Sequence, residues 1–296
     1  MTGKLNRTLL VIKFRHILTT LFFSGLALLL TGCNNMVALD PKGWIGHEEK
    51  DLFLISSLLM LIVVIPVIIL TIVIPFKARA TNLKAKYIPD WGHSTMVEII
   101  CWTIPIVIII GLAILTWFST HRLDPYKPLV SDRAPLKVQV VALNWRFLFI
   151  YPEENIATIN TLVFPVNRPV AFDITSTGPM NGFQIPQLGS QIYAMAGMNT
   201  KLHLIADQMG EYRGHSTNYS GDGFANMHFI AKVVSQEDFA AWVASTKKSA
   251  QALNIDTYES LVPDSHDTSI QYFSSVQNNL YNDVIMSYMM PMNKGE

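Results

Sequence analysis

Cysteine is almost absent from this chain of 296 residues. The two cysteines are Cys33 and Cys101, and none follows residue 101. Each lies in or at the end of an apolar run, so a disulfide framework of the kind that stabilises small secreted domains is not expected. The long cysteine-free part of the chain also has no thiolate with which to bind a soft metal ion.

Charge is scarce as well. Only 15% of the residues are charged, and 22 basic residues balance 22 acidic ones. The absence of a basic excess argues against nucleic-acid binding, which needs a cationic surface. Apolar residues make up 50% of the chain. One soluble core of this size cannot bury so much apolar material, so the composition indicates a membrane protein.

Residues 1–32 are typical of a lipoprotein-type signal peptide. Basic residues precede an apolar stretch at 17–30, which ends in Leu-Thr-Gly before Cys33. This ending resembles the lipobox of bacterial lipoproteins, in which the cysteine is acylated and the chain is cut just before it. The alternative is an ordinary signal or a first membrane helix in which Cys33 is incidental. If the chain is cut before Cys33, residues 33–51 form a periplasmic N-terminal segment.

Residues 52–118 predict a transmembrane helix hairpin. The runs Leu52–Phe76 and Ile99–Phe118 are uncharged and long enough to cross the hydrocarbon layer. The intervening loop, 77–96, carries four basic residues and a single acid, Asp90. By the positive-inside rule this loop is cytoplasmic, so the chain is expected in the bacterial inner membrane with its C-terminal part in the periplasm.

Residues 119–234 change from helical to strand-like patterning. Apolar and polar residues alternate at 137–143, 170–174 and 201–205, and turn-forming clusters stand at 167–169, 178–182 and 220–223. This pattern predicts a β-sandwich or Greek-key barrel. After it, residues 235–296 are expected to form a helical C-terminal arm. Ser235 and Asp238 resemble a capping box, and another helix is expected at 281–290.

Three local motifs resemble subunit II of the haem–copper oxidases. Tyr87–Thr95 and the following Glu98–Pro105 are similar to its helix hairpin, and Asn144–Phe147 to the tryptophan-rich segment that opens its cupredoxin domain. Phe183–Met198 resembles the loop with the first copper ligand and is close to that of the bo-type ubiquinol oxidases. The resemblance extends from about residue 33 to the C-terminus. It implies a membrane hairpin followed by a periplasmic cupredoxin-like Greek-key sandwich.

The family's dinuclear copper centre uses two bridging thiolates, two imidazoles, a thioether and a backbone carbonyl. The first ligand position is located two residues before the Phe-x-x-Pro element at Phe183, and the others by counting back from Met227 with the family's spacing. Residues other than the family's ligands occupy these positions. Those positions hold Asn181, Ser216, Asn218, Ser220 and Phe224. The remaining histidines, His203, His215, His228 and His266, show no ligand-pair spacing, and His203 is expected at the surface or at a sheet edge. No metal site is therefore expected in this chain.

Without copper, the resemblance implies a subunit of a ubiquinol oxidase. Such a complex oxidises ubiquinol, reduces oxygen to water and pumps protons. Haem b, haem o or a, and one copper ion would lie in partner subunit I. This chain would hold no catalytic or cofactor-binding residue, and would assemble with subunits I, III and IV in the lipid bilayer. Two alternatives stay open: an electron-transfer subunit of a cytochrome c oxidase, which the missing ligands oppose, and a separate copper-free lipoprotein that binds a partner.

Several residues carry two interpretations. Glu98 is either an acid favoured by the helix dipole or, as in the family, an acid at the mouth of a proton-uptake channel of the catalytic subunit. For Trp145 we expect core packing rather than contact with a donor cytochrome. Asn181, Ser216 and Ser220 are expected to form internal hydrogen bonds, and no acid–base partner supports a hydrolase. The methionine-rich segment 286–292 is expected to pack rather than to bind copper(I).

Overall fold

The computed structural model describes residues 20, 24, 36–82, 88–89 and 92–289. It consists of two units, residues 1–40 and 41–296. In the first unit, the described part includes a short 3-10 turn, η2, at Val37–Leu39. The expected signal peptide and Cys33 lie outside the described residues, apart from Thr20 and Ser24.

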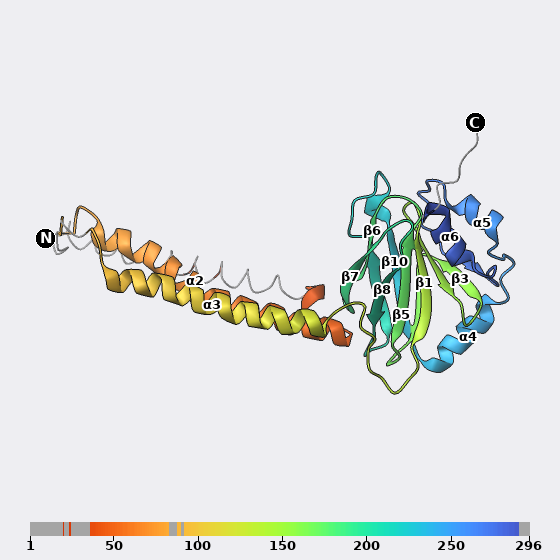
Figure 1. The fold of residues 1–296 in the computed structure, drawn as a ribbon, viewed down its shortest axis with the longest axis horizontal. Coiled ribbons are helices and arrows are strands. Elements are labelled where there is room, and N and C mark those ends of the chain that lie inside the picture. The colour runs from red at the N-terminus through yellow and green to blue at the C-terminus, as the bar shows by residue number, and fades with distance from the viewer. Residues whose placement is uncertain (1–19, 21–23, 25–35, 83–87, 90–91, 290–296) are drawn as a thin grey trace, which may run out of the picture. The chain divides into compact units, whose positions relative to one another are not determined.

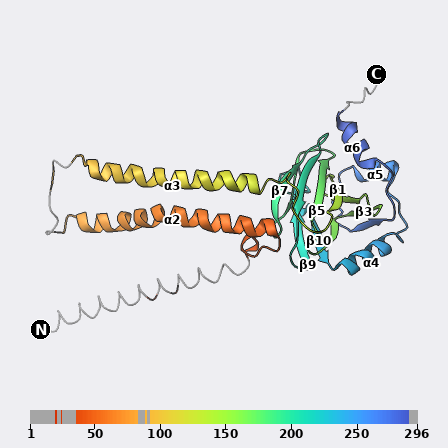
Figure 2. The ribbon, with the colours of Figure 1, turned by 60° about the horizontal axis from the view of Figure 1, so that its bottom comes forward.

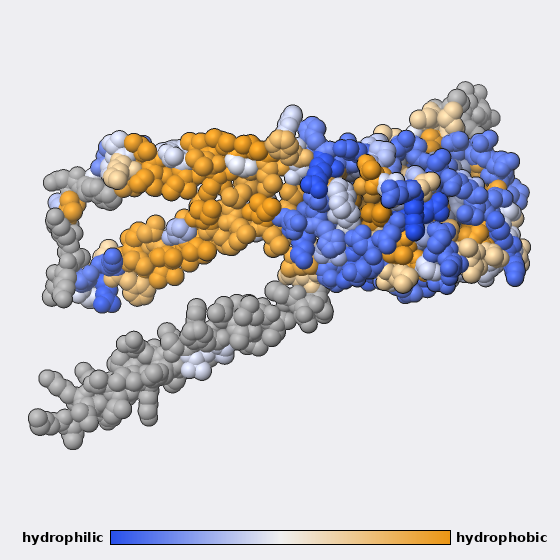
Figure 3. All heavy atoms as spheres, turned by 90° about the horizontal axis from the view of Figure 1, so that it is seen from below, coloured by the Kyte–Doolittle hydropathy of each residue, from blue (hydrophilic) through white to orange (hydrophobic). Residues whose placement is uncertain are grey.

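Two long antiparallel helices open the second unit, α2 at Trp44–Ala78 and α3 at Thr95–Arg122 (Figures 1 and 2). Both are long and apolar enough to cross a membrane. Figure 3 shows their surface as almost entirely hydrophobic, in contrast to the mostly hydrophilic domain that follows. Each helix extends beyond both ends of its predicted apolar run, because the backbone hydrogen bonds of a helix continue into the neighbouring polar residues.

The domain that follows is a sandwich of two sheets. The six-stranded sheet has the order β11-β3-β2-β1-β5-β8, and the five-stranded sheet the order β4-β10-β9-β6-β7. In the first, β1 pairs in parallel with β5, and in the second β10 pairs in parallel with β4. The strands are β1 Leu136–Ala142, β2 Phe147–Tyr151, β3 Ile156–Ile159, β4 Thr161–Pro165, β5 Val170–Ser176, β6 Asn181–Ile185, β7 Gly189–Ala194, β8 Thr200–Leu204, β9 Gly210–His215, β10 His228–Val234 and β11 Gln271–Phe273.

Aromatic rings fill the space between the sheets. Phe147 and Phe149 from β2 meet Phe183 of β6 and Phe229 of β10, with ring centroids 5.0 to 6.3 Å apart. These four side chains are almost fully buried. The inward residues of the alternating strand β1, such as Val138 and Val140, belong to the same core. The predicted β-sandwich is thus confirmed.

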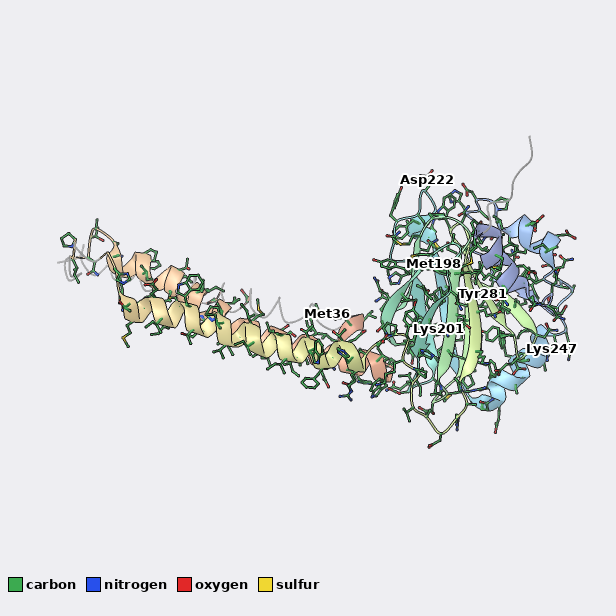
Figure 4. The ribbon with its side chains drawn as sticks, in the orientation of Figure 1. Met36, Met198, Lys201, Asp222, Lys247 and Tyr281 are labelled. Carbon is green, nitrogen blue, oxygen red and sulfur yellow. The ribbon has the colours of Figure 1, made fainter. Side chains whose placement is uncertain are left out.

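The C-terminal arm contains α4 at Gln236–Thr246, α5 at Ile255–Leu261, strand β11 and α6 at Leu280–Met289. Helices α5 and α6 of the arm cover part of the outer face of the six-stranded sheet, while α4 packs against the core between the sheets. Val141 and Leu148 of the sheet form a second apolar cluster with residues of α5 and α6. In Figure 4, Tyr281 of α6 lies over this sheet, and its hydroxyl donates to Asn199 Oδ1 at 3.0 Å. The outward-facing Val141, Leu148 and Ile150 are therefore buried, whereas Lys137 at the start of β1 stays exposed.

The predicted capping box is present at the start of α4. The hydroxyl oxygen of Ser235 accepts from the backbone N–H of Asp238 at 3.0 Å. The helix expected at 281–290 is α6. One element of the arm differs from the expectation of a helical segment, since β11 is a strand that pairs with β3. Helix α5 agrees with a helical arm, although its bounds were not predicted. The turn expected at 178–182 also ends earlier, because β6 begins at Asn181.

Candidate functional site

The positions aligned with the family's copper ligands meet at one end of the five-stranded sheet. Asn181 opens β6, Ser216 follows the end of β9, and Met227 precedes β10. These three strands are neighbours in the order β10-β9-β6. The backbone N–H of Ser216 donates to the carbonyl of Met227 at 3.1 Å. Residues far apart in the sequence are thus brought together at this end of the sheet.

Ser216 and Asn181 form hydrogen bonds with each other and with nearby backbone groups, while the buried hydroxyl of Thr217 beside them has no partner among the described residues. Ser216 Oγ donates to Asn181 Oδ1 at 3.3 Å and accepts from the backbone N–H of Gly182 at the same distance. Asn181 Nδ2 donates to the carbonyl of Pro179 at 3.0 Å. Asn181 is 1% exposed and Ser216 is 4% exposed, so this network lies inside the domain. Its hydroxyl and amide groups are poor ligands for copper.

The loop between β9 and β10 contributes the other positions. Asn218 Nδ2 donates to the carbonyl of Met180 at 2.6 Å. Ser220 Oγ lies 4.0 Å from Met227 Sδ, so the one retained thioether contacts a hydroxyl. Phe224 begins the 3-10 turn η3, Phe224–Asn226, and its carbonyl accepts from the N–H of Met227. The tip of this loop is marked by Asp222 in Figure 4.

Trp145 packs between this loop and the C-terminal arm. Its indole N–H donates to the carbonyl of Ser220 at 3.0 Å. The ring stacks on His266 of the arm, with centroids 4.8 Å apart, and lies so close to Gly223 that a Cβ there would be 2.2 Å from a ring atom. The side chain is half-buried against the main core. This is the packing role expected for Trp145.

Its two neighbours in the sequence also contact the arm. Asn144 Nδ2 donates to Asp264 at 2.7 Å, and Arg146 Nη2 donates to the carbonyl of Leu261 at 2.8 Å. The pKa of the Arg146 guanidinium is lowered by its burial, an effect that Asp267 opposes. The motif Asn144–Arg146 therefore holds the segment 261–267 in place. Sequence reasoning singled out Trp145 but missed Arg146, although a charged residue beside buried strand residues is a signal of pairing.

The histidines of the domain lie apart from one another, except for one pair. His203 is half-buried on the edge strand β8, as expected, with Nδ1 3.0 Å from the carbonyl of Pro125. His215 and His228 face each other across β9 and β10. The pKa of His215 is lowered by burial and by the nearby Arg213. Among the described residues, no three His, Cys, Asp or Glu side chains are grouped so that they could hold a metal ion.

Glu98 lies in the first turn of α3, after the N-cap Ser94. Its carboxylate is 3.6 Å from His93 Nδ1, and both side chains are more than half exposed. Sequence reasoning did not single out His93. Of the methionine-rich segment, Met286 and Met289 are exposed on α6, while residues 290–292 lie outside the described part of the chain.

Two family models match the part of the chain that follows the hairpin. Residues 117–234 match the family "Cytochrome C oxidase subunit II, periplasmic domain", and residues 247–292 match "COX Aromatic Rich Motif". Among solved structures, the periplasmic domain of subunit II of cytochrome oxidase from Bradyrhizobium japonicum is similar with a TM-score of 0.38 and 23% identity, covering 40% of this chain and 98% of that one.

A membrane hairpin joined to a periplasmic domain of this family defines an inner-membrane subunit II of a respiratory oxidase complex. Cytochrome bo(3) ubiquinol oxidase subunit 2 of Pseudomonas putida is 51% identical over 96% of this chain and 89% of its own length. Ubiquinol oxidase subunit 2 of Acetobacter aceti is 47% identical over 88% and 85%, and quinol oxidase subunit 2 of Bacillus subtilis is 36% identical over 83% and 75%. The chain belongs to the family of ubiquinol oxidase subunits II.

Proposed function

We propose that this chain is a subunit II that carries no electrons. The observation that supports the proposal most directly is the buried hydrogen bond between Ser216 and Asn181, where copper-bearing relatives would place a thiolate and an imidazole. The nearby Ser220 and Phe224 replace the other thiolate and imidazole, and no cysteine follows residue 101.

In this proposal electrons enter the complex directly from ubiquinol. The donor would be oxidised at partner subunit I, where haem b, haem o or a, and one copper ion would reduce oxygen. Two ubiquinols and one oxygen molecule give two ubiquinones and two waters, and the protons that are pumped would also cross subunit I. The names of the similar proteins, which are ubiquinol or quinol oxidase subunits, support this donor.

The role of this chain would be to dock on subunit I, to cover its periplasmic face and to support assembly with subunits III and IV. The apolar side chains along α2 and α3 are exposed and suit contact with lipid and with partner helices. Glu98, at the cytoplasmic end of α3, would supply an acid at the mouth of a proton-uptake path in subunit I.

We also propose that Cys33 is acylated after removal of residues 1–32. An acyl chain adds little to the membrane attachment of a chain that two helices already anchor. We therefore expect a Cys33→Ala variant to insert into the membrane, provided that the signal is still processed. Loss of the mature variant from the membrane fraction would contradict this expectation, and mass spectrometry of the wild-type N-terminus tests acylation itself.

Oxygen uptake by the purified complex tests the electron route. We expect rapid uptake with ubiquinol and none with reduced cytochrome c. Turnover with cytochrome c would mean that electrons enter the complex by a route other than ubiquinol, and it would overturn the proposal. Copurification of this chain with haem-containing subunits in detergent distinguishes the proposal from the alternative, a separate copper-free lipoprotein that binds a partner.

A further inference from the structure

A pocket of about 480 Å³ lies where the membrane hairpin joins the periplasmic domain. Its walls come from the first turn of α2, the last turn of α3, the loop that follows α3 and the edge strand β8 with its continuation. The volume is in the range of ligand pockets, which measure roughly 300 to 1,000 Å³. The copper-ligand positions do not line this pocket.

One wall of the pocket, at the end of α3, lies near the expected depth of the lipid headgroups, while Trp44 stands about 12 Å before the uncharged run of α2. Trp44 is the first residue of α2 and Arg122 the last of α3, and both line the pocket. At a rise of about 1.5 Å per residue, Arg122 stands about 6 Å beyond Phe118, the last residue of the uncharged run. Headgroup regions extend roughly 5 to 7 Å on each side of the hydrocarbon layer. Since the loop between the helices is cytoplasmic, this depth belongs to the outer leaflet.

Charges of both signs line the pocket. Arg122 and Lys127 contribute two cations, and Asp124 and Asp207 contribute two carboxylates. Arg122 is held in place, because its Nη2 lies 2.7 Å from Glu48 Oε1 and its guanidinium stands over the ring of Trp44 at 5.6 Å. Because the lining contains two cationic and two anionic side chains, the pocket suits a ligand with one negatively charged group and one positively charged group.

Apolar side chains complete the lining. Leu129, Val130 and Ile205 contribute alongside the ring of Trp44. Val130 is fully exposed on the loop after α3. A ligand that fits this surface needs an apolar body beside its charged group, because an exposed aliphatic side chain at membrane depth is stabilised by contact with hydrocarbon.

We propose that this pocket binds the headgroup and upper acyl chain of one outer-leaflet phosphatidylethanolamine. The phosphate would lie between Arg122 and Lys127, and the ammonium would donate to Asp124 and Asp207. Asp207 already faces His47 at 3.5 Å and Asp124 accepts from the backbone N–H of Tyr126, and an anionic headgroup without an amine would bring no further donor to either carboxylate. A choline headgroup has the charge but no N–H to donate. The bound lipid would fill the joint between the hairpin and the domain.

Photocrosslinking in vesicles tests the proposal. The complex that contains the full chain is reconstituted in equal parts of phosphatidylethanolamine, phosphatidylglycerol and phosphatidylcholine, with a photoreactive trace of each in turn. We expect the ethanolamine probe to label peptides that contain residues 123–130 and 201–207. Loss of two exposed ion pairs should make labelling by the glycerol probe weaker by about fivefold.

Three variants sharpen the test. Arg122→Gln with Lys127→Gln should reduce labelling by the ethanolamine probe to the level of the glycerol probe. Ile205→Trp keeps every charge but fills the apolar part, and should reduce labelling as well. The control, Lys247→Gln with Lys248→Gln on the exposed end of α4, should label like the wild type. Lys247 lies away from the hairpin in Figure 4.

Equal labelling by all three headgroups, or unchanged labelling of both pocket variants, would overturn the proposal. So would protection of the same peptides by added ubiquinol, which would identify the ligand as a quinol. Haem content and oxygen uptake of each variant show that the complex is assembled. Because labelling is read on the peptides, its outcome does not depend on which donor the complex oxidises.

Discussion

The position of Trp145 depends on a glycine. Trp145 itself adopts a positive φ of 65°, an uncommon conformation for a bulky residue, and its ring occupies the space where a Cβ of residue 223 would stand. The absence of a side chain at residue 223 therefore leaves room for the Trp145 ring. The indole in turn joins the loop that contains Ser220 to the C-terminal arm through His266.

Gly223→Ala should displace this ring. The new methyl group would overlap the indole, and overpacking of this kind costs typically about 1 to 3 kcal/mol. We expect a lower thermal midpoint of the full chain and a shifted tryptophan emission. Gly92→Ala is the matched control, since no atom lies within 4 Å of the Cβ that it adds. An unchanged midpoint for Gly223→Ala would show that the loop adjusts freely.

His215 gives the domain a pH dependence. Burial, together with Arg213, lowers the pKa of His215 in the folded state, while His228 and Gln184 face it from the neighbouring strands. The unfolded chain therefore binds a proton more readily than the folded chain. The contribution of the neutral His215 to the free energy of unfolding is fully present above the pKa of about 6.5 that a histidine has in the unfolded chain. This contribution is lost as the pH falls through the lower pKa of His215 in the folded state.

Removing the imidazole should weaken this dependence. We expect the thermal midpoint of the wild type to fall more between pH 7.5 and pH 5.5 than that of His215→Gln, measured on the full chain in detergent. The direction follows from the lowered pKa of His215 in the folded state. Parallel curves for the two proteins would contradict the assignment to His215.

Among the helices and strands, the sequence predicted those features that depend only on residues close to one another in the chain. Alternation in β1 and the capping box at Ser235 follow from neighbouring residues alone, and both are present. Strand β11 has three residues, too few to show a period, and it exists because β3 offers it an edge. The contacts of Arg146 could not be predicted either, because its partner at Leu261 is 115 residues away.

Arg146 fixes the arm to the sandwich, and its removal should loosen the arm alone. Arg146→Ala leaves the buried carbonyl of Leu261 without its donor, which costs roughly 1 to 3 kcal/mol. We expect faster hydrogen exchange in the peptides that cover residues 255–273, with β9 and β10 unaffected. Arg168→Ala, which removes a half-buried arginine that donates to the carbonyl of Ala134 and not to the arm, is the control. Uniform acceleration over the whole domain would instead mean that arm and sandwich unfold as one unit.

At the scale of the whole molecule, the two ends of the hairpin differ in the contacts that they make. The periplasmic end is tied to the domain by specific contacts, such as the backbone N–H of Gly46 to the carbonyl of Leu188 at 3.0 Å and Ser190 Oγ to Glu49 at 2.9 Å. At the opposite end, the exposed Glu98 has a polar neighbour, His93. An acid in this place can act either on its own helix or on a partner subunit.

Replacing Glu98 separates these two roles. If the carboxylate only complements the dipole of α3, Glu98→Gln costs about 0.3 to 1 kcal/mol of stability and leaves ubiquinol oxidation unchanged. If it delivers protons to subunit I, turnover should fall by at least about tenfold, since acid–base groups contribute factors of this size or larger. We expect the second result, with most of the activity kept in Glu98→Asp. Oxygen uptake and thermal stability of the same preparations distinguish the two, because a purely structural acid would change the stability and spare the rate.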